Sequence, residues 1–151
     1  MILSIQGLQN IIIVTKGITE SLDAIKRTAM ATIEEVKIIL DEIAEELPAE
    51  IYKDLNGGII LLPQVKLHKK SVDEDLYVMG EYRHERISGR YIVVYYGSVE
   101  KLYGSLSRNR LKNKLRAIVK HEFIHHLESM AGERHLEIED ERKLAKYLKK
   151  K

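Results

Sequence analysis

The chain has 151 residues, of which 44% are hydrophobic and 32% charged, and its formal net charge is +2. These values are typical of one soluble globular domain and exclude a disordered chain. So small a net charge gives no reason to expect binding to nucleic acid or to an anionic membrane. The chain contains no cysteine, which excludes disulfides, thiolate ligands and a cysteine nucleophile. Any metal ion must therefore be held by imidazole and carboxylate groups.

The N-terminal stretch MILSIQGLQNIIIVTKG is apolar, but polar residues interrupt it and no basic segment precedes it. We interpret it as a strand or an additional N-terminal piece rather than a secretion signal. Within it, the β-branched residues of 8–16 predict a strand. No apolar run approaches the ~20 residues that a membrane-spanning helix needs. We therefore expect a cytoplasmic protein with no membrane partner.

From residue 18 to residue 47 the pattern is helical. Thr32, followed three residues later by Glu35, predicts a capping box, and Pro48 should end the helix. Apolar residues recur after the cap at steps of three and four, which places them on one face with acids opposite. They are Ile33, Val36, Ile39, Leu40, Ile43 and Leu47.

Short β-branched and aromatic runs in the middle of the chain predict a small sheet. The turn NGG at 56–58 precedes a first strand, IILLP. The runs LYVMGEYRH and GRYIVVYYGS then predict an antiparallel hairpin joined by ERIS. We expect Gly97 and Ser98 to end the sheet, and 99–106 to form a short helix or turn.

Two helices are predicted to complete the chain. The first runs from about Arg108 to Met130, and Gly132 should end it because glycine readily adopts the left-handed conformation there. The second begins near Glu139 and continues into the lysine-rich end. The predicted fold class is therefore α+β: a helix, a small and mostly antiparallel sheet, a long helix packed on that sheet, and a closing helix.

The long helix carries His121, Glu122 and His125 in the pattern H-E-x-x-H. Two histidines at i and i+4 project from one helix face and can reach a single ion, while the intervening glutamate is rotated by about 100° and can act on a bound water. The apolar residues of this helix form a separate stripe that should pack on the sheet: Val119, Phe123, Leu127 and Met130. The pattern predicts one Zn²⁺ ion held by the two histidines, with Glu122 as general base.

A third protein ligand must come from beyond Gly132. His135 would have to return about 10 Å through three residues, which is the limit of an extended chain. Asp140 has eight residues for the same return, and the positive end of the next helix would stabilise its carboxylate. We therefore predict His121, His125 and Asp140 as the metal ligands, with His135 and Glu139 as the alternatives. His126 points away from the histidine pair and should bond to backbone or solvent.

Three linked segments carry a family resemblance: LNGGIILLPQVKLH, GEYRHERISGRYIVVYYGS and KHEFIHHLESMAGERHLEIED. They resemble the minimal zincin-like metallopeptidases, a family of small bacterial proteins with an H-E-x-x-H motif that were long described only as a domain of unknown function. The resemblance covers about 31–148. It implies a minimal zincin fold, zinc on His121 and His125, Glu122 as base and an acidic third ligand after the glycine.

The chain departs from this family in two ways. The glycine after the second histidine comes about one helical turn later than the commoner family pattern places it. The position of the family's third ligand therefore does not carry over directly to this chain. Family members also begin near Met30, so residues 1–29 form either a genuine N-terminal extension or the product of a start codon assigned too early. We take 30–151 as the zincin-like domain.

Several further residues could act around the motif. Candidates to stabilise an oxyanion are Tyr95, Tyr96, His84 and Arg134, and the sequence does not rank them. The basic run RNRLKNKLR, 108–116, could contact phosphates, but its leucine spacing favours the solvated side of a helix, so no nucleic-acid partner is expected. The sequence does not indicate an oligomeric state.

Two functions follow from this pattern. The first is a zinc-dependent peptidase that acts on peptides or proteins. The alternative is a zinc-stabilised binding or adaptor domain without catalysis, in which Glu122 would have no chemical role.

Overall fold

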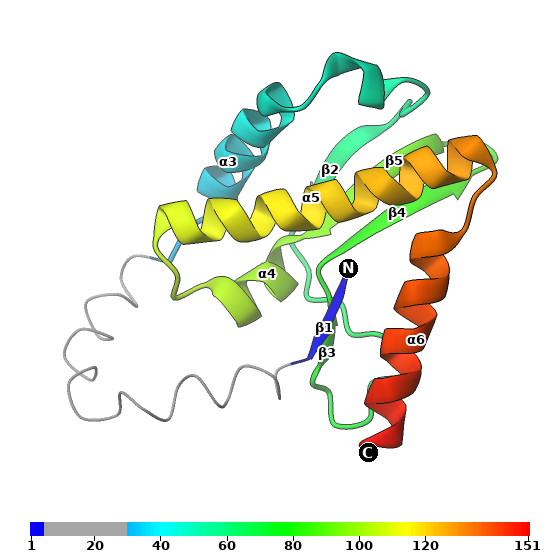
Figure 1. Ribbon diagram of the computed structural model, residues 1–151. Helices are drawn as coiled ribbons and strands as arrows, with labels where there is room; N and C mark the ends of the chain where they lie inside the picture. The colour runs from blue at the N-terminus through cyan, green and yellow to red at the C-terminus, as the bar shows by residue number, and fades with distance from the viewer. Residues whose placement is uncertain (5–29) are drawn as a thin grey trace.

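The computed structural model describes residues 1–4 and 30–151. The strand predicted at 8–16 and the helical pattern predicted for 18–29 lie outside the described residues. Within them the fold is α+β, as predicted, with helices packed on a small mixed sheet (Figure 1). Across these described ranges, no helix is both long enough and apolar enough to cross a membrane.

Helix α3 (Ile33–Glu46) begins at the predicted capping box. The Glu35 N–H donates to the Thr32 hydroxyl at 3.2 Å, and the Thr32 N–H donates to the Glu35 carboxylate at 2.7 Å. The helix ends just before Pro48, also as predicted, and a short 3-10 turn, η3 (Ala49–Tyr52), follows. The apolar stripe packs into the core through its central members: Val36, Ile39, Leu40 and Ile43.

The main sheet has three strands in the order β2 (Gly58–Leu62), β5 (Gly89–Tyr95), β4 (Gly80–Glu85). The antiparallel β4–β5 hairpin confirms the prediction. Strand β2, however, pairs with β5 in parallel, so the sheet is mixed rather than mostly antiparallel. A parallel pair needs a long crossover connection. The chain between β2 and β5, which contains the loop after β2 and the strand pattern of 76–85, supplies it.

The strand predicted over 76–84 divides at Met79. Its first part, β3 (Leu76–Val78), pairs antiparallel with β1 (Ile2–Ser4), whereas β4 pairs with β5. Met79 joins both ladders, because its N–H donates to the Met1 carbonyl and its own carbonyl accepts from the Tyr95 N–H, each at 3.0 Å. The two sheets therefore share one continuous length of chain, and β4 is an edge strand of the larger sheet.

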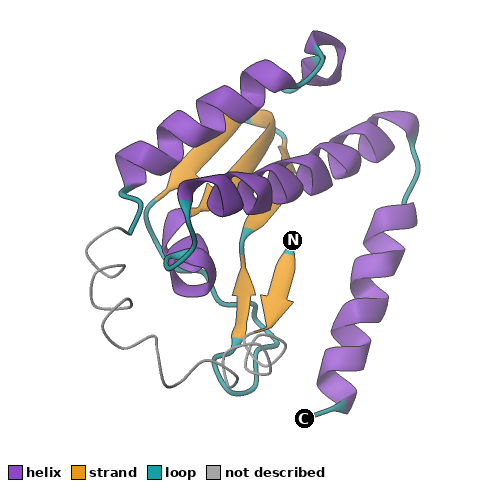
Figure 2. Ribbon diagram, turned by 60° about the vertical axis from the view of Figure 1, so that its left-hand side comes forward, coloured by secondary structure: helices purple, strands orange, loops and turns teal. Residues whose placement is uncertain are grey.

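Strand β5 is the centre of the fold, and its side chains alternate between two buried faces. Ile92 and Val94 belong to the main core with α3 and α5 (Arg108–Ala131). Tyr91, Val93 and Tyr95 pack in a second cluster on the opposite face. Helices α3 and α5 lie next to one another over the first face (Figure 2).

The prediction that Gly97 and Ser98 end the sheet is wrong, because both lie in the first turn of α4 (Tyr96–Tyr103). A Cβ at Gly97 would lie 2.5 Å from the Val65 nitrogen, so this turn needs glycine to approach the loop after β2. The buried Ser98 hydroxyl then accepts from the Lys66 N–H at 2.9 Å. Contact with that loop therefore decides where the chain turns helical, and it is not visible in the local pattern.

Helix α5 ends as predicted. Gly132 adopts the left-handed conformation with φ 72°, and the Glu133 N–H closes the turn on the Glu128 carbonyl at 2.8 Å. The next helix, α6 (His135–Lys149), begins four residues earlier than the predicted Glu139. The cause is the Glu128 side chain, which accepts from the Leu136 N–H at 2.8 Å and so caps α6 from the preceding helix.

The predicted packing stripe of α5 is correct only in its first half. Val119 and Phe123 are buried, whereas Leu127 and Met130 are 44% and 41% exposed. The last buried residue of the helix is His126, so the final turn extends past the core. His126 donates to the Lys53 carbonyl at 2.8 Å, which agrees with its predicted backbone bond.

The basic run at the start of α5 is largely paired with α3. Arg108 and Lys112 reach Glu42, at 2.6 and 2.8 Å, and Arg116 reaches Glu46 at 2.9 Å. These ion pairs connect two helices that also share an apolar core. The run therefore has a structural explanation that does not require a phosphate partner.

A group of polar side chains lies next to the second buried cluster. Glu81 accepts from Lys66 at 2.7 Å, from the Tyr95 hydroxyl at 2.7 Å and from Arg83 at 2.9 Å. Burial raises the pKa of the Glu81 carboxyl, but the hydrogen bonds from Lys66, Tyr95 and Arg83 outweigh it and lower that pKa to about 2.

We predict that Glu81→Gln destabilises the protein by about 2 kcal/mol at pH 7, since hydrogen bonds to an ionised group are lost. A carboxyl whose pKa is lower in the folded state stabilises the fold above its unfolded value, near 4.5, and loses that contribution as pH falls toward 2. Urea unfolding at several pH values should therefore show the difference between wild type and variant shrinking below pH 4.5. Asp41→Asn, in an exposed ion pair with Lys37, is the control and should change stability little at any pH. If the difference in unfolding free energy between wild type and Glu81→Gln stayed constant down to about pH 2, the lowered pKa of Glu81 would be contradicted.

Candidate metal centre

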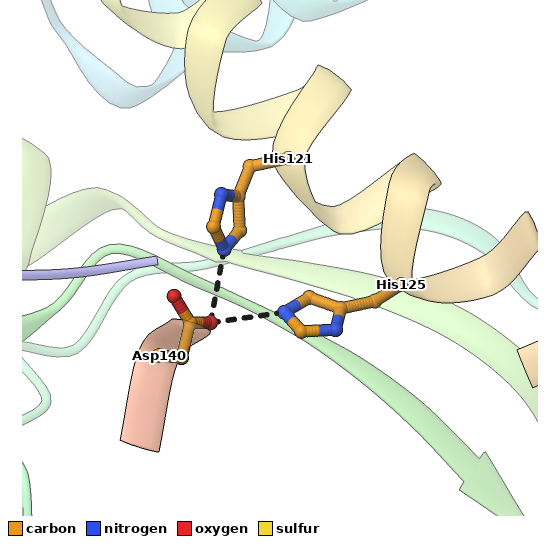
Figure 3. A group of neighbouring side chains, drawn as sticks. All are labelled: His121, His125 and Asp140. Atoms are coloured by element: carbon orange, nitrogen blue, oxygen red, sulfur yellow. Dashed lines mark hydrogen bonds and ion pairs between the residues drawn. The ribbon is translucent and has the colours of Figure 1, made fainter. Parts of the chain in front are cut away.

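The two histidines of the motif lie one turn apart on α5 and point to the same side of the helix, as Figure 3 shows. Their rings are 5.0 Å apart between centroids. The helix packs on the sheet through Ile118, Val119 and Phe123, so its register in the core determines that His121 and His125 face sideways. The two side chains are only 15% and 16% exposed.

The Asp140 carboxylate approaches this pair from α6. Its Oδ2 lies 3.1 Å from Nε2 of His121 and 3.1 Å from Nε2 of His125. One ligand atom from each of the three residues lies within 4.8 Å of the other two. The structure thus brings together the three residues that the sequence predicted as a group.

The alternative third ligands lie elsewhere. The His135 side chain is 80% exposed, with Nδ1 3.5 Å from Glu133, and the Glu139 side chain is 57% exposed and pairs with Lys143. The reason given for preferring Asp140 nevertheless needs correction. Because α6 begins at His135, Asp140 is in its second turn and not at the positive helix end.

The three residues influence one another's protonation. Burial raises the pKa of Asp140, but the hydrogen bonds to His121 and His125 outweigh it and hold that pKa well below its usual range. The hydrogen bond to Asp140 raises the pKa of His125, and burial opposes it. An ionised carboxylate is the form that a metal ion requires.

The donor set fits zinc. Two imidazole nitrogens and one carboxylate oxygen are a common ligand set of catalytic zinc sites, which keep a fourth position open. With zinc–ligand bonds of about 2.0–2.1 Å, tetrahedral ligands lie about 3.3 Å apart, close to the observed spacing of Asp140 from each histidine. A cavity of about 250 Å³ borders His125, Asp140 and Glu122 and provides room beside the ligands.

Glu122 is 1% exposed, and both of its oxygens have partners. The Tyr82 N–H of the edge strand donates to Oε2 at 2.9 Å, and the Met1 amino group forms an ion pair with Oε1. The same amino group donates to the Gly80 carbonyl at 2.8 Å. Residue 1 therefore lies in the cavity next to the motif, a contact between chain positions that the sequence did not suggest.

The candidates for oxyanion stabilisation separate into two groups. Tyr95 is buried in the Glu81 cluster, and the Tyr96 hydroxyl donates to the Ala31 carbonyl at 2.9 Å, so neither faces the site. His84 and Arg134 line a second cavity of about 420 Å³ that also borders His125.

Two residues of the site were missed at the sequence level. Tyr82 lines both cavities and hydrogen-bonds to His126 at 3.3 Å, and His68 lines the smaller cavity. His126 donates through Nε2 to a carbonyl, so in the neutral ring Nδ1 carries no hydrogen and accepts a hydrogen bond from the Tyr82 hydroxyl. The alternation of β4 could have indicated Tyr82, since it is two residues after Gly80 on the face toward α5; His68 left no such signal.

Comparison with known proteins adds a fold relative but no activity. No family model matches the chain, and no curated protein matches it. Among solved structures, the chain is similar to a conserved hypothetical protein from Thermus thermophilus. The TM-score is 0.56 at 26% sequence identity, and the match covers 67% of this chain and 98% of that one.

At Gly80 the edge strand lies close against α5. A Cβ there would lie 2.9 Å from Ile118 Cγ2 and 3.3 Å from Glu122 Cγ. We predict that Gly80→Ala destabilises the protein by about 1–3 kcal/mol, because either the helix or Glu122 must move. Thermal or urea unfolding measures the loss.

Ile118→Ala provides the matched background, since it removes the closest of those atoms. If the crowding is local, Gly80→Ala should cost less in Ile118→Ala than in wild type. Equal costs in the two backgrounds would show that the contact at Ile118 is not the cause.

Proposed function

We propose that the protein is a zinc-dependent metallopeptidase of the minimal zincin type, with one zinc ion held by His121, His125 and Asp140. The observation that supports it most is the convergence of Nε2, Nε2 and Oδ2 on one point beside the buried Glu122. The resemblance in the H-E-x-x-H segment points to the same chemistry.

A bound zinc ion would lower the pKa of a water ligand to about 7 and polarise the carbonyl of a substrate. Glu122 would take the proton from the attacking water and deliver it to the leaving amine. The Tyr82 N–H holds its carboxylate toward the cavity that His125 and Asp140 also line. For this role the Met1 amino group must leave Glu122, since it occupies the oxygen that would accept the proton.

The site lies along an edge strand, which suits an extended peptide as substrate. Strand β4 has β5 on one side only, and its Gly80 carbonyl and Tyr82 N–H point toward the site, where they contact Met1 and Glu122. Both cavities border His125 and Tyr82; the smaller one also borders Gly80 of this strand, and the larger one borders His84. A peptide that runs along β4 would pass the three ligands.

One observation favours a second function, a zinc-stabilised binding domain without turnover. Both oxygens of Glu122 are already bonded, and the carboxylate is buried, as expected of a structural ion pair. In that case Glu122 would stabilise the fold and the zinc ion would join α6 to α5. Metal content and hydrolysis distinguish the two functions.

We predict about one zinc ion per chain in the purified protein. Single substitutions His121→Ala, His125→Ala and Asp140→Ala should each abolish retention after dialysis, because the remaining two ligands hold the ion weakly. Elemental analysis gives the ratio. His135→Ala and Glu139→Gln are the controls and should retain zinc. Absence of zinc from wild type even after reconstitution, or full retention in Asp140→Ala, would refute the ligand set.

We predict that Glu122→Gln keeps its zinc and loses hydrolysis of a peptide library by at least about 100-fold, since a general base contributes about 10²–10⁴. Mass spectrometry of the cleaved library measures the rate for wild type, Glu122→Gln and the exposed control Glu139→Gln. Cleavage by Glu122→Gln at the wild-type rate would exclude it as the base. A zinc-loaded wild type that cleaves nothing would favour the binding domain.

A further inference from the structure

Helix α6 carries the third ligand but has no buried residue. It stands apart from the main sheet, joined to the end of α5 by a short loop and descending beside β1 and β3 (Figures 1 and 2). Core packing, which fixes His121 and His125, therefore does not fix Asp140. Besides the bonds of Asp140 to His121 and His125, the attachments at the two ends of α6 decide where this carboxylate lies.

The first attachment of α6 is at its N-terminus. Only three residues separate it from α5, and the Glu128 carboxylate caps the Leu136 N–H. One of the three is Gly132 in the left-handed conformation. This attachment holds only the N-terminal end of the helix.

The second attachment is at the other end of the helix. The Tyr147 hydroxyl donates to Asp75 Oδ1 at 2.6 Å and accepts from the Val72 N–H at 3.1 Å. Lys151 reaches Asp75 Oδ2 at 2.9 Å and also pairs with Asp73. Asp75 itself is 7% exposed and directly precedes β3, so the anchor is part of the sheet framework.

We infer that Tyr147, bonded to Asp75, is a positioning residue for the third metal ligand; this inference rests on the proposed zinc site. Asp140 lies seven residues before Tyr147, about 10 Å along the helix. If the far end shifted by about 1 Å around the Gly132 turn, Asp140 would move by roughly 0.5 Å. Metal–ligand distances tolerate about 0.2 Å, so loss of the anchor disturbs the site.

The experiment compares Tyr147→Phe with Tyr96→Phe. The control removes a hydroxyl of α4 that donates to the Ala31 carbonyl at 2.9 Å. A chelator competition titration gives the zinc dissociation constant of each protein. Hydrogen exchange on the metal-free proteins gives the protection of α6 amides relative to those of α5. Asp75→Asn is added because its amide oxygen can still accept from Tyr147, whereas Asp75→Ala cannot support the bond.

We expect Tyr147→Phe and Asp75→Ala to weaken zinc binding by about 10-fold, the lower end of what outer residues contribute to metal affinity. Their α6 amides should exchange faster in the metal-free state while α5 is unchanged. Tyr96→Phe should match wild type in both measurements, and Asp75→Asn should lie nearer to wild type than Asp75→Ala.

Three results would overturn the inference, and each has a different meaning. If wild type binds zinc and Tyr147→Phe binds it equally well, the positioning role is wrong and the zinc site stands. If wild type binds no zinc, the proposed function fails and the positioning role fails with it. Unchanged exchange in α6 of Tyr147→Phe would show that the hydroxyl does not hold the helix.

Discussion

The close packing of α5 on the edge strand β4 is the contact on which the candidate site depends. Gly80 lets the helix approach until Ile118 and Glu122 would touch a Cβ at that position. The helix register set by this contact buries Glu122 and turns His121 and His125 to the side. The same strand then bonds to the glutamate through the Tyr82 N–H. The direction of the two histidines and the position of Glu122 therefore share one structural cause.

Burying Glu122 carries a cost that its partners must offset, because an ionised carboxylate without hydrogen bonds is unstable in an apolar interior. The Tyr82 N–H is a permanent partner, since it belongs to the sheet. The second partner is the Met1 amino group, which directly precedes the three-residue strand β1 paired with β3. The burial of Glu122 is therefore offset by one hydrogen bond from the sheet and one ion pair with the chain terminus.

Local signals were predictable, and contacts between distant segments were not. The Thr32 capping box, the hairpin and the left-handed Gly132 depend on residues within a few positions, so the sequence shows them directly. Helix α6 starts early because Glu128 of another helix caps it. The convergence of Asp140 with the histidines was predicted by chain reach, although the supporting argument about the helix end was wrong. The apolar spacing of α5 continues through Leu127 and Met130, but the core it packs against ends earlier, so the sequence alone did not show that these two residues are exposed.

The candidate site divides between two parts of the protein that are held by different forces. His121, Glu122 and His125 belong to a helix packed on the apolar core, whereas Asp140 belongs to a helix without a buried residue, held by a turn, a carboxylate cap and polar contacts at Asp75. Asp140 bonds directly to both histidines. A metal ion would replace those bonds with stronger ones between the same two parts, so metal binding and the docking of α6 should be thermodynamically linked. Contacts that hold α6 in place in the metal-free protein then make the free energy of metal binding more favourable, because less ordering is needed on binding.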